Sequence, residues 1–310
     1  MTDKSNEYRI VRKQYISDAD YTQISALQRV CEDAEGIALK LELDYKLADA
    51  QNRKELINDP TVNEFMCYHE DTLIAYLGIC GFGEQTDPLE LTGMVHPDYR
   101  RMGIFRTLSE QALAECRRRN TRLALGLCDR KSEAGQAMLH KRSDALHHTE
   151  YEMVLQGKPE APGEDQLRGV NLRKAVNADA AELARQDSIY FGEEFGQGTE
   201  AASKAYVKMP EEEEKRGFII YLAVKNGAVI GKVNLQISNG LGGIYGLGVL
   251  PEERGKGYGR AILRLAVQKL IEAGAETVYL QVLTDNEKAL ALYRSCGFET
   301  RSVMDYFIIG

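Results

Sequence analysis

One stretch of the chain combines glycines with basic residues in a spacing that suits phosphate binding. It follows an apolar segment and runs Arg254, Gly255, Lys256, Gly257, Tyr258, Gly259 and Arg260. The glycines leave the backbone bare, so that successive N–H groups can approach a pyrophosphate closely. The arginines and the lysine add cationic groups at the same point. A helix that begins here would direct its unpaired N–H groups and its positive dipole end toward the anion. We interpret residues 254–260 as a phosphate-binding bend.

Two other phosphate-binding motifs fit this bend less well. A dinucleotide-binding fold expects an acidic residue about 20 positions after the glycines, at the end of the next strand. Glu276 lies near that distance but precedes an apolar segment. A P-loop requires Ser or Thr directly after Gly-Lys, whereas Lys256 is followed by Gly257.

A second group of residues with chemical potential lies downstream, between residues 284 and 298. Thr284 and Glu287 have capping-box spacing, which predicts that a short helix begins there. Asn286 and Tyr293 then project along one stripe of this helix, and Gly297 ends it. An amide and a phenol are thus expected on one helix face.

The elements around these residues predict an α/β domain. Apolar periodicity indicates a helix over 259–272 and strands over 170–173, 244–250, 277–283 and 303–309. Two further strands, 218–224 and 228–237, flank Asn226-Gly227, which is a strong hairpin signal. The cofactor is expected at the end of the 244–250 strand, where the bend begins.

The chain also contains a weaker copy of the bend at residues 95–106. Arg254 lies 154 residues after Arg100, and a second similarity, around Arg12 and Arg173, has a spacing of 161. Two similar spacings in the same order indicate duplication of a whole domain of about 150 residues. We therefore expect an N-terminal domain at 1–155, a linker rich in Pro and Gly at 156–169, and a C-terminal domain at 170–310.

Composition narrows the class of protein. The net charge of −8 argues against a nucleic-acid binder and is compatible with an amine partner. The first 20 residues contain no apolar signal segment, and no stretch approaches the length needed to cross a membrane. The six cysteines and five histidines show no metal-ligand spacing. We expect a cytoplasmic enzyme without a metal site or a membrane partner.

On these motifs, the chain resembles the GCN5-related N-acetyltransferase (GNAT) superfamily. The match comprises an R-x-x-G-x-G bend at Arg254, Gly257 and Gly259, and an N-x-x-A-x-x-x-Y-x-x-x-G-F helix at Asn286, Ala289, Tyr293, Gly297 and Phe298. It covers residues 170–310 closely and residues 8–155 loosely. The pair of copies resembles the tandem, two-domain type, with an architecture like that of mycothiol synthase. This resemblance implies two GNAT-like domains, each a mixed, mostly antiparallel sheet flanked by helices.

The resemblance also implies an acetyl-CoA site in the C-terminal domain. The backbone of Leu247 and Val249 would bind the pantetheine, residues 254–260 the pyrophosphate, and Asn286 the pantetheine arm. Tyr293 would lie beside the thioester sulfur and act as general acid. The implied activity is N-acetylation of a primary amine on a small molecule or peptide. A non-catalytic acyl-CoA sensor and a transferase of another acyl group stay open as alternatives.

The general base is not identified by the sequence. Segment 242–249, where many relatives carry a glutamate, has no acid. A water chain or a residue from elsewhere would serve instead. Glu193, Glu194 and the run 211–214 qualify by charge only, and a solvated helix face explains the run better. Tyr245 could hold a water or could belong to the core.

The first copy departs from the motif at several positions. Phe105 replaces Gly259, Leu139 replaces Tyr293 and Ser132 replaces Asn286, although a shift of one residue would place His140 opposite Tyr293. Glu90 and His96 flank the strand before this bend, where bases are often found in the family. We expect the first domain to be a degenerate copy that packs against the second and shapes its substrate cleft.

Overall fold

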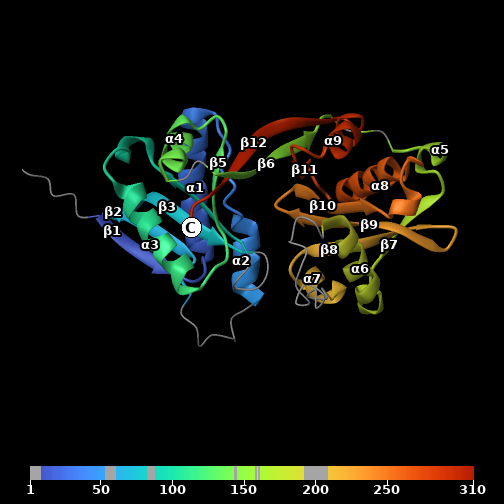
Figure 1. Cartoon of the computed structure of the whole chain (residues 1–310), viewed down its shortest axis with the longest axis horizontal. Helices are drawn as coiled ribbons and strands as arrows, with labels where there is room; N and C mark the ends of the chain where they lie inside the picture. The colour runs from blue at the N-terminus through green and yellow to red at the C-terminus, as the bar shows by residue number, and fades with distance from the viewer. Residues whose placement is uncertain are drawn as a thin grey trace, which may run out of the picture. The chain divides into compact units, whose positions relative to one another are not determined.

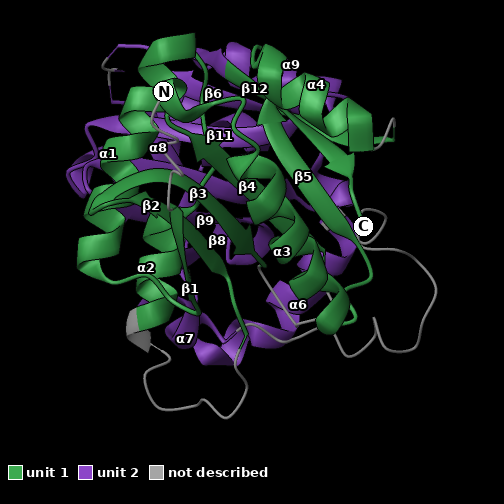
Figure 2. Cartoon of the chain, turned by 90° about the vertical axis from the view of Figure 1, so that its left-hand side faces the viewer, with its two compact units in different colours: residues 1–150, 302–310 green, residues 151–301 purple. Residues whose placement is uncertain are grey.

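The computed structural model describes residues 8–52, 61–81, 88–142, 145–157, 159, 161–191 and 209–310. It divides into two compact units, one formed by residues 1–150 with 302–310 and the other by residues 151–301 (Figure 2). Residues 302–310, expected in the C-terminal domain, group with unit 1. They do so because the last strand, β12 (Phe298–Ile308), pairs antiparallel with β5 of that unit from Met304 to Ile308.

Unit 2 is built on a sheet whose strands lie in the order β7-β8-β9-β10-β11. These strands are β7 (Val170–Lys174), β8 (Phe218–Lys225), β9 (Ala228–Ser238), β10 (Leu241–Val249) and β11 (Thr277–Leu283). Neighbouring strands are antiparallel up to β10, and β10 and β11 are parallel. The expected hairpin between β8 and β9 turns at Asn226 and Gly227, which both have positive φ, as a tight hairpin turn requires.

Helices cover both faces of the unit 2 sheet (Figure 1). On one face α8 (Tyr258–Glu272) packs Ile262 and Ala266 against Val233 and Ile244 of the sheet. On the other face α6 (Ala180–Phe191) packs Leu183 on β8. Among the described residues, unit 2 also contains the helical elements α5 (Glu164–Leu167), η2 (Asn177–Asp179), α7 (Pro210–Lys215), η4 (Pro251–Glu253) and α9 (Glu287–Arg294).

Unit 1 repeats this architecture, with strands in the order β1-β2-β3-β4-β5-β12. Its strands are β1 (Tyr8–Lys13), β2 (Glu64–His69), β3 (Thr72–Cys80), β4 (Leu89–Val95), β5 (Ala124–Asp129) and β6 (Leu146–Leu155), which continues into unit 2. Its helices are α1 (Asp18–Glu35), α2 (Leu43–Asn52), η1 (Pro97–Tyr99), α3 (Ile104–Arg118) and α4 (Glu133–Arg142). The α3 helix packs on one face of the sheet, and α1 packs on the other.

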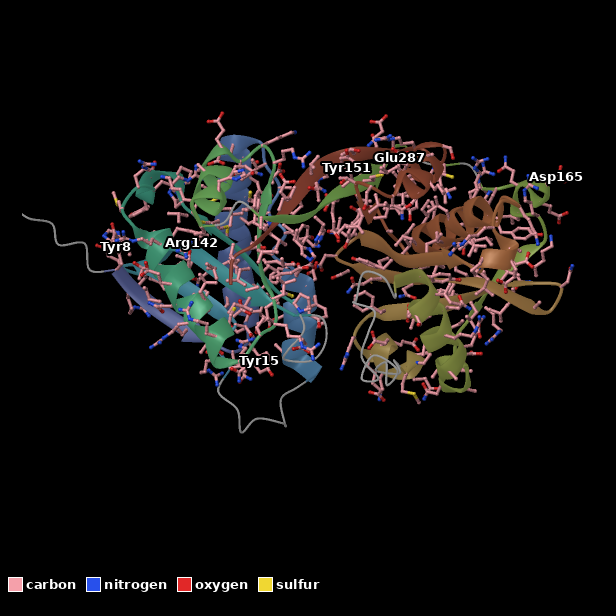
Figure 3. The ribbon with its side chains drawn as sticks, in the orientation of Figure 1. Tyr8, Tyr15, Arg142, Tyr151, Asp165 and Glu287 are labelled. Atoms are coloured by element: carbon pink, nitrogen blue, oxygen red, sulfur yellow. The ribbon has the colours of Figure 1, made fainter. Side chains whose placement is uncertain are left out.

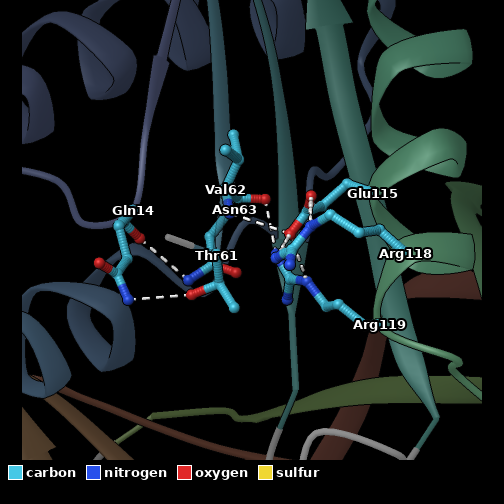
Figure 4. A network of polar contacts seen from close by, with 7 residues as sticks. All are labelled: Gln14, Thr61, Val62, Asn63, Glu115, Arg118 and Arg119. Atoms are coloured by element: carbon cyan, nitrogen blue, oxygen red, sulfur yellow. Dashed lines mark hydrogen bonds and ion pairs between the residues drawn. The ribbon is translucent and has the colours of Figure 1, made fainter. Parts of the chain in front are cut away.

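Polar networks support the unit 1 fold. Glu115, near the end of α3, accepts hydrogen bonds from the Val62 N–H at 3.1 Å and from Arg118 and Arg119 at 2.8 Å (Figure 4). Burial alone would raise the pKa of Glu115, but these donors outweigh it and hold the pKa at about 2. A second network joins α2 to β2, where Lys46 donates to the buried carboxylate of Glu64 at 2.9 Å.

Candidate active site

The strands β10 and β11 separate beside the phosphate-binding bend. Their parallel pairing covers Leu241–Ile244 and Thr277–Leu280 and, among the described residues, ends there, although β10 continues to Val249. In the same region, two residues of β10 between Tyr245 and Gly248 face one residue of β9, which is a β-bulge. Gly246, in the bulge, has φ of 54°. The bulge therefore directs the end of β10 away from β11.

Because the two strands separate, backbone groups near the end of β10 face the side of β11 without pairing to the described residues of that strand. The Leu250 N–H donates to the Ile230 carbonyl on the β9 side at 2.9 Å. Because successive residues of a strand point their backbone groups to opposite edges, those of Val249 face the β11 side. Leu247 and Val249 direct their side chains into the core under α8. Their predicted contact with a ligand therefore involves the backbone.

The bend has the conformation of an uncapped helix N-terminus. Gly255 and Gly257 lie in the left-handed region, with φ of 76° and 80°, and Gly257 precedes α8 without a side-chain cap. Within the part of the chain that the structure describes, the N–H groups of Tyr258, Gly259 and Arg260 have no acceptor. A Cβ added to Gly255 would meet nothing within 4 Å. These donors and this open space suit an anion.

Each predicted cation of the bend has a protein partner. Arg254 Nε donates to the Val249 carbonyl at 3.0 Å, and the Arg260 guanidinium donates to Ser295 Oγ at 3.0 Å. Lys256 pairs with Glu253 at 2.9 Å. All three are exposed side chains, so these contacts can exchange for contacts with a ligand.

A fourth cation, Arg168, lies at the bend and is not part of the predicted site. It follows α5, inside the segment expected to be a linker. A Cβ added to Gly257 would lie 2.9 Å from Arg168 Nε, so the guanidinium rests against the second glycine. No motif spacing could have found this residue, because only the tertiary fold brings it to the bend.

Asn286 precedes α9, whose first residue, Glu287, is labelled in Figure 3. Its Oδ1 accepts the Ala289 N–H at 3.1 Å, so Asn286 is the N-cap of α9. The helix is therefore capped two residues after Thr284, and the predicted start at Thr284 is wrong. The cap fixes the carboxamide and leaves its NH₂ group able to donate to a ligand.

Tyr293 lies on α9 with 8% of its surface exposed. Its ring packs against Phe298 with centroids 6.3 Å apart. Its hydroxyl has no hydrogen-bond partner among the described residues. Burial raises the pKa of Tyr293 to about 12, so that the phenol is protonated at neutral pH.

The sheet face opposite α8 carries a row of polar side chains next to the strand separation. We call it the polar row, and it consists of Lys232, Gln236, Tyr245 and Tyr279. Tyr245 Oη lies 2.5 Å from Tyr279 Oη and 3.4 Å from Gln236 Oε1. Lys232, on β9, is buried and paired with Asp187 of α6. The ring of Tyr190 lies against Gly248, where a Cβ would collide with it.

Of the acidic residues considered as bases, Glu212, Glu213 and Glu214 form ion pairs with other residues. The 211–214 run lies on α7, where Glu212 pairs with Lys215, Glu213 with Arg216 and Glu214 with Lys174. This agrees with a solvated helix face. Glu193 and Glu194 lie outside the described residues.

The corresponding region of unit 1 has the same bend but a filled interior. Gly103 matches Gly257 with φ of 80°, and Arg101 adopts φ of 66° where unit 2 has Gly255. Phe105 turns inward, and its Cε2 would lie 2.9 Å from a Cβ on Gly93 of β4. The remaining cavity is about 30 Å³, room for about one water, and is lined mainly by apolar side chains, including Phe105 and Leu139.

The α4 helix settles which residues of unit 1 replace the amide and the phenol. Ser132 Oγ accepts the Gly135 N–H at 3.3 Å, the contact that Asn286 makes in unit 2. Leu139 is buried in the position of Tyr293, while His140 is exposed and packs on Phe307. Unit 1 therefore has no phenol at this position.

Comparisons with known proteins agree with this geometry. The profile of the acetyltransferase (GNAT) family matches residues 27–142 and again residues 181–298. The chain therefore belongs to the GNAT acetyltransferase family, with one copy in each half, and is an N-acetyltransferase. The resemblance and the fold class inferred from the sequence are confirmed.

Relatives and solved structures match this chain over most of its length. A mycothiol acetyltransferase from Streptomyces avermitilis is 30% identical over 247 residues, covering 74% of each chain. Another from Kocuria rhizophila is 26% identical over 230 residues, covering 69% of this chain and 73% of the other. A GCN5-related N-acetyltransferase from Sphaerobacter thermophilus aligns with a TM-score of 0.69 at 18% identity, covering 97% and 96%. A tandem GNAT protein from the clavulanic acid biosynthesis pathway aligns with a TM-score of 0.64 at 18% identity, covering 98% and 99%.

Across the described ranges, no helix is both long and apolar enough to cross a membrane.

Proposed function

We propose that unit 2 binds acetyl-CoA and transfers its acetyl group to a primary amine of a small molecule. The observation that carries this proposal is the separation of β10 from β11 next to the uncapped N-terminus of α8, with Tyr293 on the neighbouring α9. The names of the mycothiol acetyltransferases that this chain resembles favour a small-molecule acceptor over a peptide.

In this proposal the pyrophosphate lies against the bend. The N–H groups of residues 258–260 donate to its oxygens, and Arg254, Lys256 and Arg260 exchange their present partners for phosphate contacts. Arg168 supplies a fourth positive charge from the side of Gly257. The backbone of Leu247 and Val249 and the NH₂ group of Asn286 hold the pantetheine.

Tyr293 donates to the leaving sulfur as general acid. Its raised pKa keeps the proton on the phenol at neutral pH. The amine must reach the thioester uncharged, and deprotonating a lysine-like amine of pKa about 10.4 at pH 7 costs about 4.6 kcal/mol. The binding site must therefore select the neutral form or accept its proton.

We further propose that unit 1 binds no acetyl-CoA. Phe105 and Leu139 occupy the space between β4 and β5, and β4 lacks the bulge of β10. The expected stoichiometry is one acetyl-CoA per chain. Isothermal titration calorimetry measures it, and two equivalent sites would contradict the proposed degeneracy.

The activity itself can be tested by thiol release from acetyl-CoA across a panel of primary amines. The panel should contain amino sugars, amino acid amides, polyamines, N-terminal peptides and the acceptor of the mycothiol acetyltransferases. Turnover with a small amine, and an acetylated product of the expected mass, supports the proposal. Binding of acetyl-CoA without turnover of any amine would favour a sensor, and faster turnover of a longer acyl-CoA would assign another donor.

A further inference from the structure

The strand registers show where an acidic residue is missing from unit 2. In unit 1, β3 and β4 pair without interruption from Ala75 and Val95 to Cys80 and Glu90. In unit 2 the bulge adds one residue to β10. At the bend, a residue of unit 2 has a number 154 higher than its counterpart in unit 1. Before the bulge this difference is one smaller, so Glu90 corresponds to Gly243.

The pairing of each strand with its neighbour, β5 or β11, independently gives the same correspondence between Glu90 and Gly243. Glu90 pairs with Leu125 of β5, and Gly243 pairs with Tyr279 of β11. Tyr279 lies 154 residues after Leu125, the spacing that relates the two bends. By the same register, Tyr245 corresponds to Thr92.

The carboxyl group of Glu90 points to the sheet face that α1 covers in unit 1. Burial raises the pKa of Glu90 to about 7. The positive charge of Lys40 lowers this pKa and offsets part of the rise, whereas Glu42 and Glu150 raise it further. One of its oxygens, Oε2, has no hydrogen-bond partner among the described residues. Unit 1 thus has a carboxyl group at the point where β4 and β5 begin to separate.

In unit 2 two phenols occupy the corresponding space. A Cβ added to Gly243 would lie 2.5 Å from Tyr245 Cε2 and 2.7 Å from its Oη, so the tyrosine lies over the glycine. Its hydroxyl is 2.5 Å from that of Tyr279, and Phe218 contacts the edge of its ring. Both tyrosines are half-buried, and Tyr245 directly follows Ile244, the last residue of β10 paired with β11.

We infer that the Tyr245–Tyr279 hydroxyl pair replaces the missing carboxylate: it accepts a hydrogen bond from the neutral acceptor amine and relays the amine proton to solvent. This inference rests on the proposed function of unit 2. A phenolic oxygen can accept one proton while donating another, so two linked phenols can pass a proton without either becoming charged.

The reaction balances with solvent as the proton acceptor. The amine nitrogen forms a bond to the carbonyl carbon, and the carbon–sulfur bond breaks. The amine proton moves to the phenolic oxygen that accepts the hydrogen bond of the amine. The proton of that phenol moves to the second phenol, and the proton of the second phenol moves to water. The sulfur receives its proton through Tyr293, which regains one from solvent. The products are the acetamide and free CoA.

Single substitutions test the relay. Tyr245→Phe and Tyr279→Phe retain the rings and remove one hydroxyl each. Each should lower kcat about 100-fold with the best amine of the panel, the lower range for a lost proton-transfer group. The affinity for acetyl-CoA should stay within about 2-fold, because neither residue lies at the bend. Tyr221→Phe, a half-buried tyrosine of β8 that packs under α8, is the matched control.

A residue exchange between the copies gives a sharper test. Gly243→Glu combined with Tyr245→Thr reproduces the unit 1 residues, and the threonine removes the ring that would collide with the new Cβ. Tyr245→Thr alone should be nearly inactive. The double variant should recover at least 10-fold over it, with a pH–rate profile that now rises with the ionisation of a carboxyl group. Thermal unfolding of each variant identifies losses caused by misfolding.

The outcomes separate this inference from the function on which it rests. A wild-type chain that turns over no amine refutes the proposed function and the relay with it. An active wild type whose two Phe variants keep kcat within 2-fold of the Tyr221→Phe control refutes the relay alone. So does a folded double variant that is no faster than Tyr245→Thr.

Discussion

Removing the hydroxyl of Tyr293 should reduce catalysis and leave the fold intact. In the Tyr293→Phe variant the ring keeps its contact with Phe298, whose centroid lies 6.3 Å away. No described hydrogen bond is lost, because the hydroxyl has no partner among the described residues. We therefore expect the free energy of unfolding to change by less than about 0.5 kcal/mol.

The catalytic effect can be estimated from the pKa of this phenol. Its pKa of about 12 lies above the value of about 8.5 for a free thiol, and complete transfer of the proton would cost about 4.8 kcal/mol. The main loss is therefore the hydrogen bond to the developing thiolate, about 2 to 3 kcal/mol for a charged acceptor. That corresponds to a kcat about 30- to 150-fold lower.

The assay is thiol release at saturating acetyl-CoA and amine, with Tyr221→Phe as control and a thermal melt of each variant. The KM for acetyl-CoA should change little, because the lost interaction forms mainly in the transition state. A kcat within 3-fold of wild type would refute the role of Tyr293. A lower melting temperature accompanying the loss would show that the hydroxyl supports the fold instead.

Four further predictions concern binding and stability. Arg168→Ala should weaken CoA binding about 5-fold at low ionic strength and less at high salt, measured by calorimetry, and an unchanged affinity would remove Arg168 from the site. Gly255→Ala and Gly257→Ala should each destabilise the chain by about 1 kcal/mol in thermal melts, because both glycines have positive φ; an unchanged melting temperature in both variants would contradict this expectation. Lys46→Met should cost about 3 to 5 kcal/mol in urea unfolding, because the buried carboxylate of Glu64 loses its counter-charge and keeps the hydrogen bond from Tyr76; an unchanged free energy of unfolding would refute the contribution of this ion pair. Glu115 has a pKa of about 2 in the folded chain against an ordinary 4.5, so its ionisation contributes about 3 kcal/mol to the free energy of unfolding. This contribution is complete above pH 4.5 and is lost as the pH falls toward 2. In Glu115→Gln this part of the dependence of stability on acid pH should disappear, and an unchanged dependence would contradict the assignment.

The sequence by itself determined the features that depend on neighbouring residues. The bend, the helix that follows it and the hairpin at Asn226-Gly227 depend on local propensities and on glycine conformations, which a short stretch of chain specifies. The duplication and the family could be predicted because two motifs recur at matched spacing. The start of α9 was displaced by two residues because Thr284 and Asn286 are both suitable N-caps.

Only the tertiary structure decided how distant residues meet. The bulge of β10, its separation from β11, the approach of Arg168 to Gly257 and the Tyr245–Tyr279 pair all depend on strand register and on packing between segments. The same holds for the last nine residues, which pair with β5 of unit 1. Alternating patterns fix which face a strand buries, but they do not fix which strand lies beside it or where the pairing ends.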